Sequence, residues 1–201
     1  GKRHPAKRFQ KDRVGRASLD SKFFRTNDEG LNERKKYEIP AFKNFSDFIE
    51  LSSNLGNWLE TKEGVFTDII EINNIKIGIV GTNTAWFSRD DKDKEQLSFG
   101  IDLVETGLKK IEMCDIRIVL GHHPIDWFIP TKQERIKNLF KDYGVIYLHG
   151  HLHITKTTIG QYINSNFLNI QAGAAFQASE NKSNDKKNSL LWSEIDFEKR
   201  S

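Results

Sequence analysis

The clearest hydrophobic pattern in the chain is a pair of short apolar runs separated by one helix-length segment. Ile116–Leu120 and Val145–Leu148 each have the length and the aliphatic content of a buried strand. Between them, Thr131-Lys132-Gln133-Glu134 matches a capping box, which predicts the start of a helix, and Gly144 suits the residue that ends it. The order strand, loop, helix, strand, loop predicts an α/β unit that brings both strand ends to one rim.

The segment before these strands contains two helical patterns and one hairpin pattern. Apolar residues from Ala41 to Leu59 follow helical spacing, which predicts a helix docked on the domain, and Ile101–Ile111 shows the same periodicity. Val65–Ile72 and Ile75–Val80 are strand-like runs on either side of Asn73-Asn74, a good tight-turn pair. We therefore expect a β-hairpin at this place.

Beyond the second apolar run the pattern is again strand-like. Ile154–Gly160, Phe167–Gln171 and Leu190–Phe197 are predicted as strands, and Ser179–Asn188 is predicted as a polar loop. Alternating strands and helices within 201 residues predict one domain of the α/β class.

Composition bears on the cellular setting of the protein more than on its activity. The single cysteine, Cys114, excludes an internal disulfide and suits a reducing compartment, so we expect a cytoplasmic protein. No apolar run approaches the roughly 18 residues of a membrane span, and no signal-peptide pattern is present. We therefore expect no membrane partner.

Charge is spread unevenly along the chain. Residues 1–36 hold twelve Lys and Arg against five Asp and Glu, although the net charge of the whole chain is only +3. A basic segment without periodicity predicts a mobile stretch, which would either track the phosphates of a nucleic acid or form a solvated insertion. Because Phe9, Phe23 and Phe24 are the only aromatic residues there, we favour the insertion, with the folded domain spanning residues 37–201.

Five of the six histidines fall in two clusters, each directly after a predicted buried strand. The first cluster is Gly121-His122-His123-Pro124, and the second runs from His149 to His153. Imidazole is the commonest metal ligand, and α/β sheets place their sites at the carboxyl ends of strands. One histidine after a strand is more often structural, but two clusters at adjacent strand ends predict a shared metal site. The segment Trp127–Pro130 either walls this site or belongs to the core.

At these residues the chain resembles the calcineurin-like metallophosphoesterases, over about residues 37–197. His122-His123-Pro124 is similar to the fourth motif of that family, His-x-Pro, and Gly150-His151-Leu152-His153 is similar to the fifth, Gly-His-x-His. The three earlier motifs, Asp-x-His, Gly-Asp-x-x-Asp and Gly-Asn-His, do not occur, and His4 is not a convincing substitute for them. The resemblance implies a β-sandwich flanked by helices, a four-layer α/β/β/α arrangement, incomplete at the N-terminal side.

The resemblance also implies roles for individual histidines. His122 and His151 would bind one metal of a pair and His153 the other, with the remaining ligands supplied by sequence that is not present in this chain. His123 and His149 would support the ligands or face the substrate, and they are our catalytic candidates. The cofactors implied are two divalent transition metals, drawn from Mn, Fe, Zn and Ni.

In that family a hydroxide held between the two metals attacks phosphorus in line. The expected substrate is accordingly a phosphate ester: a phosphomonoester, a phosphodiester or a nucleic acid. Three histidines without carboxylates would by themselves give a mononuclear site of the zinc hydrolase kind. Two alternatives stay open: an inactive module that binds a protein partner, and one half of a split enzyme whose missing N-terminal half is supplied by a complementing chain.

Overall fold

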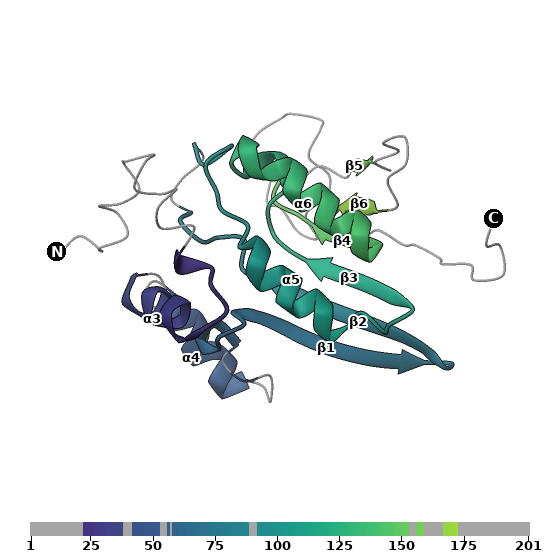
Figure 1. The fold of residues 1–201 in the computed structure, drawn as a ribbon, viewed down its shortest axis with the longest axis horizontal. Helices are drawn as coiled ribbons and strands as arrows, with labels where there is room; N and C mark the ends of the chain where they lie inside the picture. Colours follow the sequence, from purple (N-terminus) through teal and green to yellow (C-terminus); the bar gives the residue numbers. More distant parts are fainter. Residues whose placement is uncertain are drawn as a thin grey trace, which may run out of the picture.

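The centre of the molecule is a mixed β-sheet with two helices packed across it. In a computed structural model of the chain, the described residues are 22–37, 42–52, 56, 58–88, 92–152, 156–158 and 167–172. Six strands lie in the order β1-β2-β3-β4-β6-β5, and helices α5 and α6 lie over the sheet (Figure 1). The predicted α/β class is confirmed, while a second sheet is not among the described residues. The strands are β1 (Val65–Ile72), β2 (Ile75–Thr82), β3 (Ile116–Leu120), β4 (Val145–His149), β5 (Lys156–Thr158) and β6 (Leu168–Gln171).

Four neighbouring strands of the sheet run parallel. β2, β3, β4 and β6 pair in this way, so their carboxyl ends meet at one edge. β1 and β5 are the antiparallel outer strands. The predicted hairpin is confirmed: β1 joins β2 through Asn73 and Asn74, whose φ angles of 52° and 65° are those of a tight turn with two left-handed residues.

Alternate residues of each strand point to opposite faces of the sheet, and one of the two faces is buried. Val80, Val119 and Tyr147 are fully buried beneath α5 (Ile101–Lys110) and α6 (Pro130–Tyr143). Residues of the opposite parity stay half exposed, as shown by Ile72 at 54% and Leu120 at 40% of their surface. The parallel strands are therefore packed mainly by the two helices that connect them.

The helix α6 between the two histidine loops begins earlier than the capping box predicts. Its first residue is Pro130, and the N-cap position is Ile129, which makes no side-chain cap. The capping-box prediction at Thr131 is therefore wrong, because proline at the first helical position already fixes the backbone for helix entry. The predicted end is confirmed, with Gly144 in the left-handed conformation at φ 60°.

The basic segment 1–36 is only partly described, and the described part is folded. Phe23 and Phe24 are buried at 0% and 3% exposure among the core aromatics, and α3 (Asp28–Tyr37) follows them. The expectation of a mobile segment is therefore wrong for residues 22–36, because two aromatic anchors outweigh the unfavourable composition around them. Residues 1–21, and with them His4 and Phe9, lie outside the described part.

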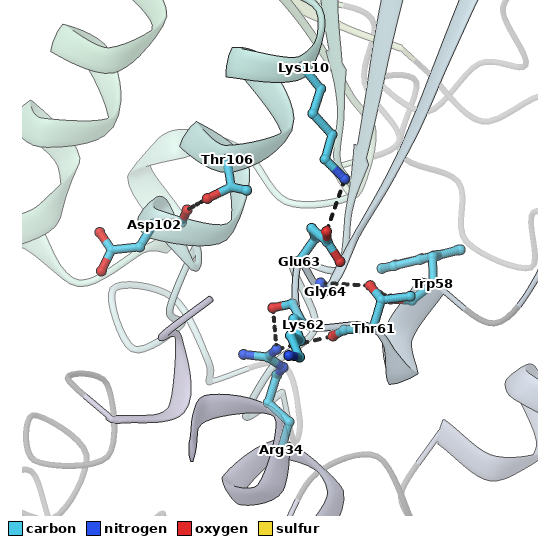
Figure 2. A network of polar contacts seen from close by, with 9 residues as sticks. All are labelled: Arg34, Trp58, Thr61, Lys62, Glu63, Gly64, Asp102, Thr106 and Lys110. Carbon is cyan, nitrogen blue, oxygen red and sulfur yellow. Dashed lines mark hydrogen bonds and ion pairs between the residues drawn. The ribbon is translucent and has the colours of Figure 1, made fainter. Parts of the chain in front are cut away.

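A buried arginine ties α3 to the loop that precedes β1. Arg34 is 0% exposed, and burial lowers the pKa of its guanidinium to about 10, which still leaves it charged at neutral pH. Figure 2 shows the side chain reaching across to this loop, next to the ion pair of Glu63 with Lys110. Its guanidinium donates to four backbone carbonyls, those of Phe23, Arg25, Thr61 and Lys62.

The region predicted as one helix from Ala41 to Leu59 is divided. The helix α4 covers Lys43–Ser52, and a short 3-10 turn, η2, covers Trp58–Glu60. On α4, Phe45 and Phe48 are 44% and 64% exposed, so the expectation that this apolar stripe is docked on the domain is wrong for them. Among the helices of the described residues, none has the length and apolarity to cross a membrane.

Candidate metal centre

Two loops at the carboxyl edge of the sheet carry the clustered histidines. The first follows β3 and holds His122 and His123; the second follows β4 and holds His151. Because β3 and β4 are adjacent and parallel, both loops leave the sheet at the same edge. Backbone bonds then join them: Gly121 N–H donates to the Leu148 carbonyl at 3.0 Å, and Gly150 N–H donates to the His122 carbonyl at 3.2 Å.

His122, His123 and His151 come together at this edge. The ligand nitrogens of the three rings all lie within 4.8 Å of one another. The closest contact is between His122 Nε2 and His151 Nδ1, at 3.1 Å. Two nitrogens that bind one tetrahedral Zn²⁺ at about 2.0–2.1 Å would be about 3.4 Å apart. The donor set and spacing of the His122–His151 pair therefore fit a single transition metal.

The first histidine loop is held from both sides by buried hydroxyl groups. Thr84 Oγ1 accepts the backbone N–H groups of His122 at 3.0 Å and His123 at 3.2 Å. Tyr147 Oη donates to the His123 carbonyl at 2.6 Å. Gly121 must be glycine between these anchors, because a Cβ there would lie 2.5 Å from Tyr147 Oη and 2.9 Å from Thr84 Cγ2. The loop is thus fixed before any ligand arrives.

The second loop holds His151 in an unusual backbone conformation. Its φ is +75°, in the left-handed region that non-glycine residues rarely occupy. The ring lies edge-on against Trp127, with 3.9 Å between ring centroids, and Trp127 also stacks on His123 at 5.7 Å. Of the two interpretations of Trp127–Pro130, both apply to Trp127, which lies against the histidine rings and also belongs to the buried core; Phe128 is part of the core at 0% exposure.

Burial differs across the cluster and controls protonation. His122 is exposed, His151 is half-buried, and His123 is buried at 4% exposure. Burial lowers the pKa of His123 to about 4, and the neighbouring His151 and His122 rings act in the same direction. His123 is therefore neutral at neutral pH, while the exposed side of His122 leaves the cluster open to solvent.

His149 occupies a separate, buried position. It is 4% exposed and stacks on Tyr147 with 5.2 Å between centroids. Its Nδ1 lies 3.3 Å from the Gly150 carbonyl oxygen, and its buried Nε2 has no hydrogen-bond partner of ordinary geometry among the described residues. Burial lowers the pKa of its imidazole. The structure does not place His149 in the three-histidine group, so its catalytic role stays a prediction.

The remaining predicted ligand falls outside the described residues. This ligand is His153, which was expected to bind a second metal. Because His153 is outside the described residues, its expected role is untested. Within the described part of the chain, the group that could hold a metal consists of histidines without a carboxylate. The roles assigned to His122 and His151 also stay predictions, although the structure brings these two rings together.

Two surface hollows lie away from the histidines. One, of about 210 Å³, is lined by residues at the start of α5 together with Lys132 and Arg135; the other, of about 240 Å³, lies beside η2 and β1. Neither is lined by a histidine. The clustered histidines therefore lie outside both hollows.

Thr84 was missed by the sequence reasoning, although the sequence contains a signal for it. It lies two residues after β2, the neighbour of β3, so it shares the edge at which the histidine loops emerge. A hydroxyl residue just beyond a parallel strand next to a histidine strand is well placed to bind the adjacent loop.

Comparison with known proteins yields limited similarity. No protein-family model matches the chain, and no curated protein matches it. Among solved structures, the chain is similar to a Staphylococcus aureus protein assigned as a 5'-nucleotidase and crystallised with α-ketoglutarate. The similarity has a TM-score of 0.36 and 15% identity, and it covers 53% of this chain but 23% of that protein. A likeness of this size does not establish a shared activity.

Proposed function

We propose that this chain carries part of the active site of a metal-dependent phosphoesterase. The observation that supports the proposal is the His122–His151 pair, with nitrogens 3.1 Å apart at the carboxyl ends of two adjacent parallel strands. His122 lies on a loop already fixed by Thr84 and Tyr147, and His151 lies on the adjacent loop, so this pair of ligands needs little rearrangement to bind a metal.

In this proposal His122 and His151 hold the metal, and the exposed side of His122 faces the substrate. A divalent metal bound there would polarise a phosphoryl oxygen and lower the pKa of water. His123 and Trp127 both lie against the His151 ring, and because both are buried they shield it from solvent. A second metal, as in the calcineurin-like enzymes that the motifs resemble, would need His153 and carboxylates from outside the described residues.

The substrate class in this proposal is a phosphate ester, whether a monoester, a diester or a nucleic acid. The histidine cluster supports the hydrolytic chemistry but contains no group that reads a base or a sugar. We therefore leave the leaving group open and test the chemistry on two simple chromogenic esters, p-nitrophenyl phosphate and bis-p-nitrophenyl phosphate.

The test combines metal content with hydrolysis, on the full chain purified without a histidine tag. At least one transition metal should be bound per chain, and Mn²⁺ or Zn²⁺ should stimulate hydrolysis of one of the two esters. His122→Ala and His151→Ala should each abolish both properties, whereas His4→Ala, which removes a histidine far away in sequence, should leave both unchanged.

The other outcomes separate the alternatives. Metal bound by the wild-type chain without hydrolysis would indicate an incomplete site that awaits a complementing half. A chain that binds no metal, with or without His122 and His151, would refute the proposal and leave the partner-binding module as the better explanation.

A further inference from the structure

The Thr84 hydroxyl is the centre of three polar contacts within the cluster. Its oxygen accepts the backbone N–H of His122 at 3.0 Å and that of His123 at 3.2 Å. The same oxygen lies 3.0 Å from Nδ1 of the His123 ring. Thr84 is 2% exposed and His123 is 4% exposed, so water does not compete easily for these positions.

The number of lone pairs decides the direction of the third contact. A hydroxyl group has two acceptor lone pairs and one hydrogen to donate. The two backbone N–H groups use both lone pairs of Thr84, because an amide N–H can only donate. The hydroxyl hydrogen therefore remains for His123, and the Nδ1 atom of that ring must accept it. If Nδ1 carried the proton, the oxygen would have to accept three hydrogen bonds.

A neutral imidazole carries one proton on its two ring nitrogens, so the direction of the Thr84 contact determines which nitrogen holds that proton. With Nδ1 acting as an acceptor, the proton lies on Nε2. A protonated ring nitrogen donates a hydrogen bond and has no lone pair for a metal. The centroid of the His123 ring is 4.5 Å from that of His151 and 4.9 Å from that of His122. The Nε2–H group of His123 is therefore a hydrogen-bond donor within the histidine cluster.

We infer that Thr84 fixes His123 in the Nε2–H tautomer, so that His123 contributes a hydrogen-bond donor to the cluster and not a third metal ligand. The inference rests on the proposed function for the nature of the acceptor, which is an anionic oxygen of a phosphate ester. Thr84 is then a positioning residue: it touches neither metal nor substrate, and it acts through the ring that it orients.

The tautomer can be measured directly, without metal and without substrate. In long-range ¹H–¹⁵N spectra of the full, metal-free chain at pH 8, His123 should show an unprotonated Nδ1 and a protonated Nε2, assigned by the signals that His123→Gln removes. Thr84→Ser keeps the hydroxyl and should preserve this pattern, whereas Thr84→Val should give a mixture of tautomers. A protonated Nδ1 in the wild-type chain would overturn the inference, whether or not the Thr84→Val variant folds.

Metal titration gives a second and independent readout. Glutamine can place an N–H donor near the position of Nε2, so His123→Gln should keep Zn²⁺ affinity within about tenfold, whereas His122→Gln should lose more than about 100-fold. An equal loss in the two variants would make His123 a ligand and refute the inference. If the wild-type chain binds no Zn²⁺, the proposed function fails, but the tautomer measured in the metal-free chain still decides the role of Thr84.

Discussion

The left-handed backbone conformation of His151 predicts that the protein with glycine at this position will be more stable than the protein with alanine. An L-residue at positive φ brings its Cβ close to the following carbonyl, which costs roughly 1–2 kcal/mol. At φ +75°, His151 bears this cost in the native state. Both His151→Ala and His151→Gly remove the imidazole and its contact with Trp127, so they differ only in Cβ and in backbone freedom.

The expected difference follows from two opposing effects. His151→Gly relieves the strain of roughly 1–2 kcal/mol, but glycine also loses more conformational entropy on folding, about 0.5–1 kcal/mol relative to alanine. The His151→Gly variant should therefore be more stable than His151→Ala by about 0.5–1 kcal/mol. In a chain of this length that corresponds to a melting temperature higher by about 1–4 °C.

Leu152 provides the matched control for this comparison. It is the next residue, is 37% exposed and has no positive φ. Without strain to relieve, Leu152→Gly should be less stable than Leu152→Ala by about 0.5–1 kcal/mol. The free energy of unfolding of the four metal-free variants can be measured in urea by far-ultraviolet circular dichroism. The glycine variant should be the more stable of its pair at position 151 and the less stable of its pair at position 152.

The same sign at both positions would refute the reasoning. His151 would then have no backbone strain of its own, and the left-handed turn would not be what holds its ring beside His122. A positive result would show that the loop holds the His151 ring in place at some cost in stability.

Three further predictions concern buried positions, two in the histidine loops and one at Arg34. Gly121→Ala should lower stability by about 1–3 kcal/mol, because its Cβ would meet Tyr147 Oη at 2.5 Å, whereas Gly150→Ala, with open space at its Cβ, should be near neutral in the same urea assay. Arg34→Met should cost more than about 3 kcal/mol, since four carbonyls lose a charged donor; an unchanged urea midpoint would show that they are solvated instead. The pKa of His123 is lowered to about 4, mainly by burial, whereas an unfolded histidine titrates near 6.5. Between those values the unfolded chain binds the proton first, so the unfolding free energy of the metal-free chain should fall as pH drops from about 6.5 to 4, by up to about 3 kcal/mol. His123→Gln should flatten that part of the pH profile, and an identical slope in this variant would contradict the assignment.

The sequence predicts best where the signal is local and periodic. The hairpin across Asn73-Asn74, the helix from Ile101 and the strands from Ile116 and Val145 are each found at the expected place. In these segments the apolar period and the turn residues indicate the same structure, so no distant contact is needed to decide between alternatives.

The sequence predicts poorly where burial depends on a distant partner. The charge of residues 1–36 suggested a mobile stretch, yet Phe23 and Phe24 pack against Trp86, with ring centroids 5.4 Å and 6.2 Å from it. The apolar stripe of α4 gave the opposite error: its spacing predicts a buried face, but Phe45 and Phe48 are exposed. Periodicity identifies a helix, but what lies beside the helix decides which of its residues are covered.

For the site, the sequence alone determined which residues are brought to the sheet edge. A buried strand followed directly by histidines leaves the chain at its carboxyl end, and two such strands in parallel deliver His122 and His151 to one rim. Only the tertiary structure decided how the rings face one another. The 3.1 Å contact, the strained turn at His151, the exclusion of His149 and the hydroxyl of Thr84 all depend on groups between 29 and 39 residues apart or on backbone angles. Residue spacing fixes the strand on which a side chain lies, whereas hydrogen-bond geometry between loops fixes its orientation and the nitrogen that carries its proton.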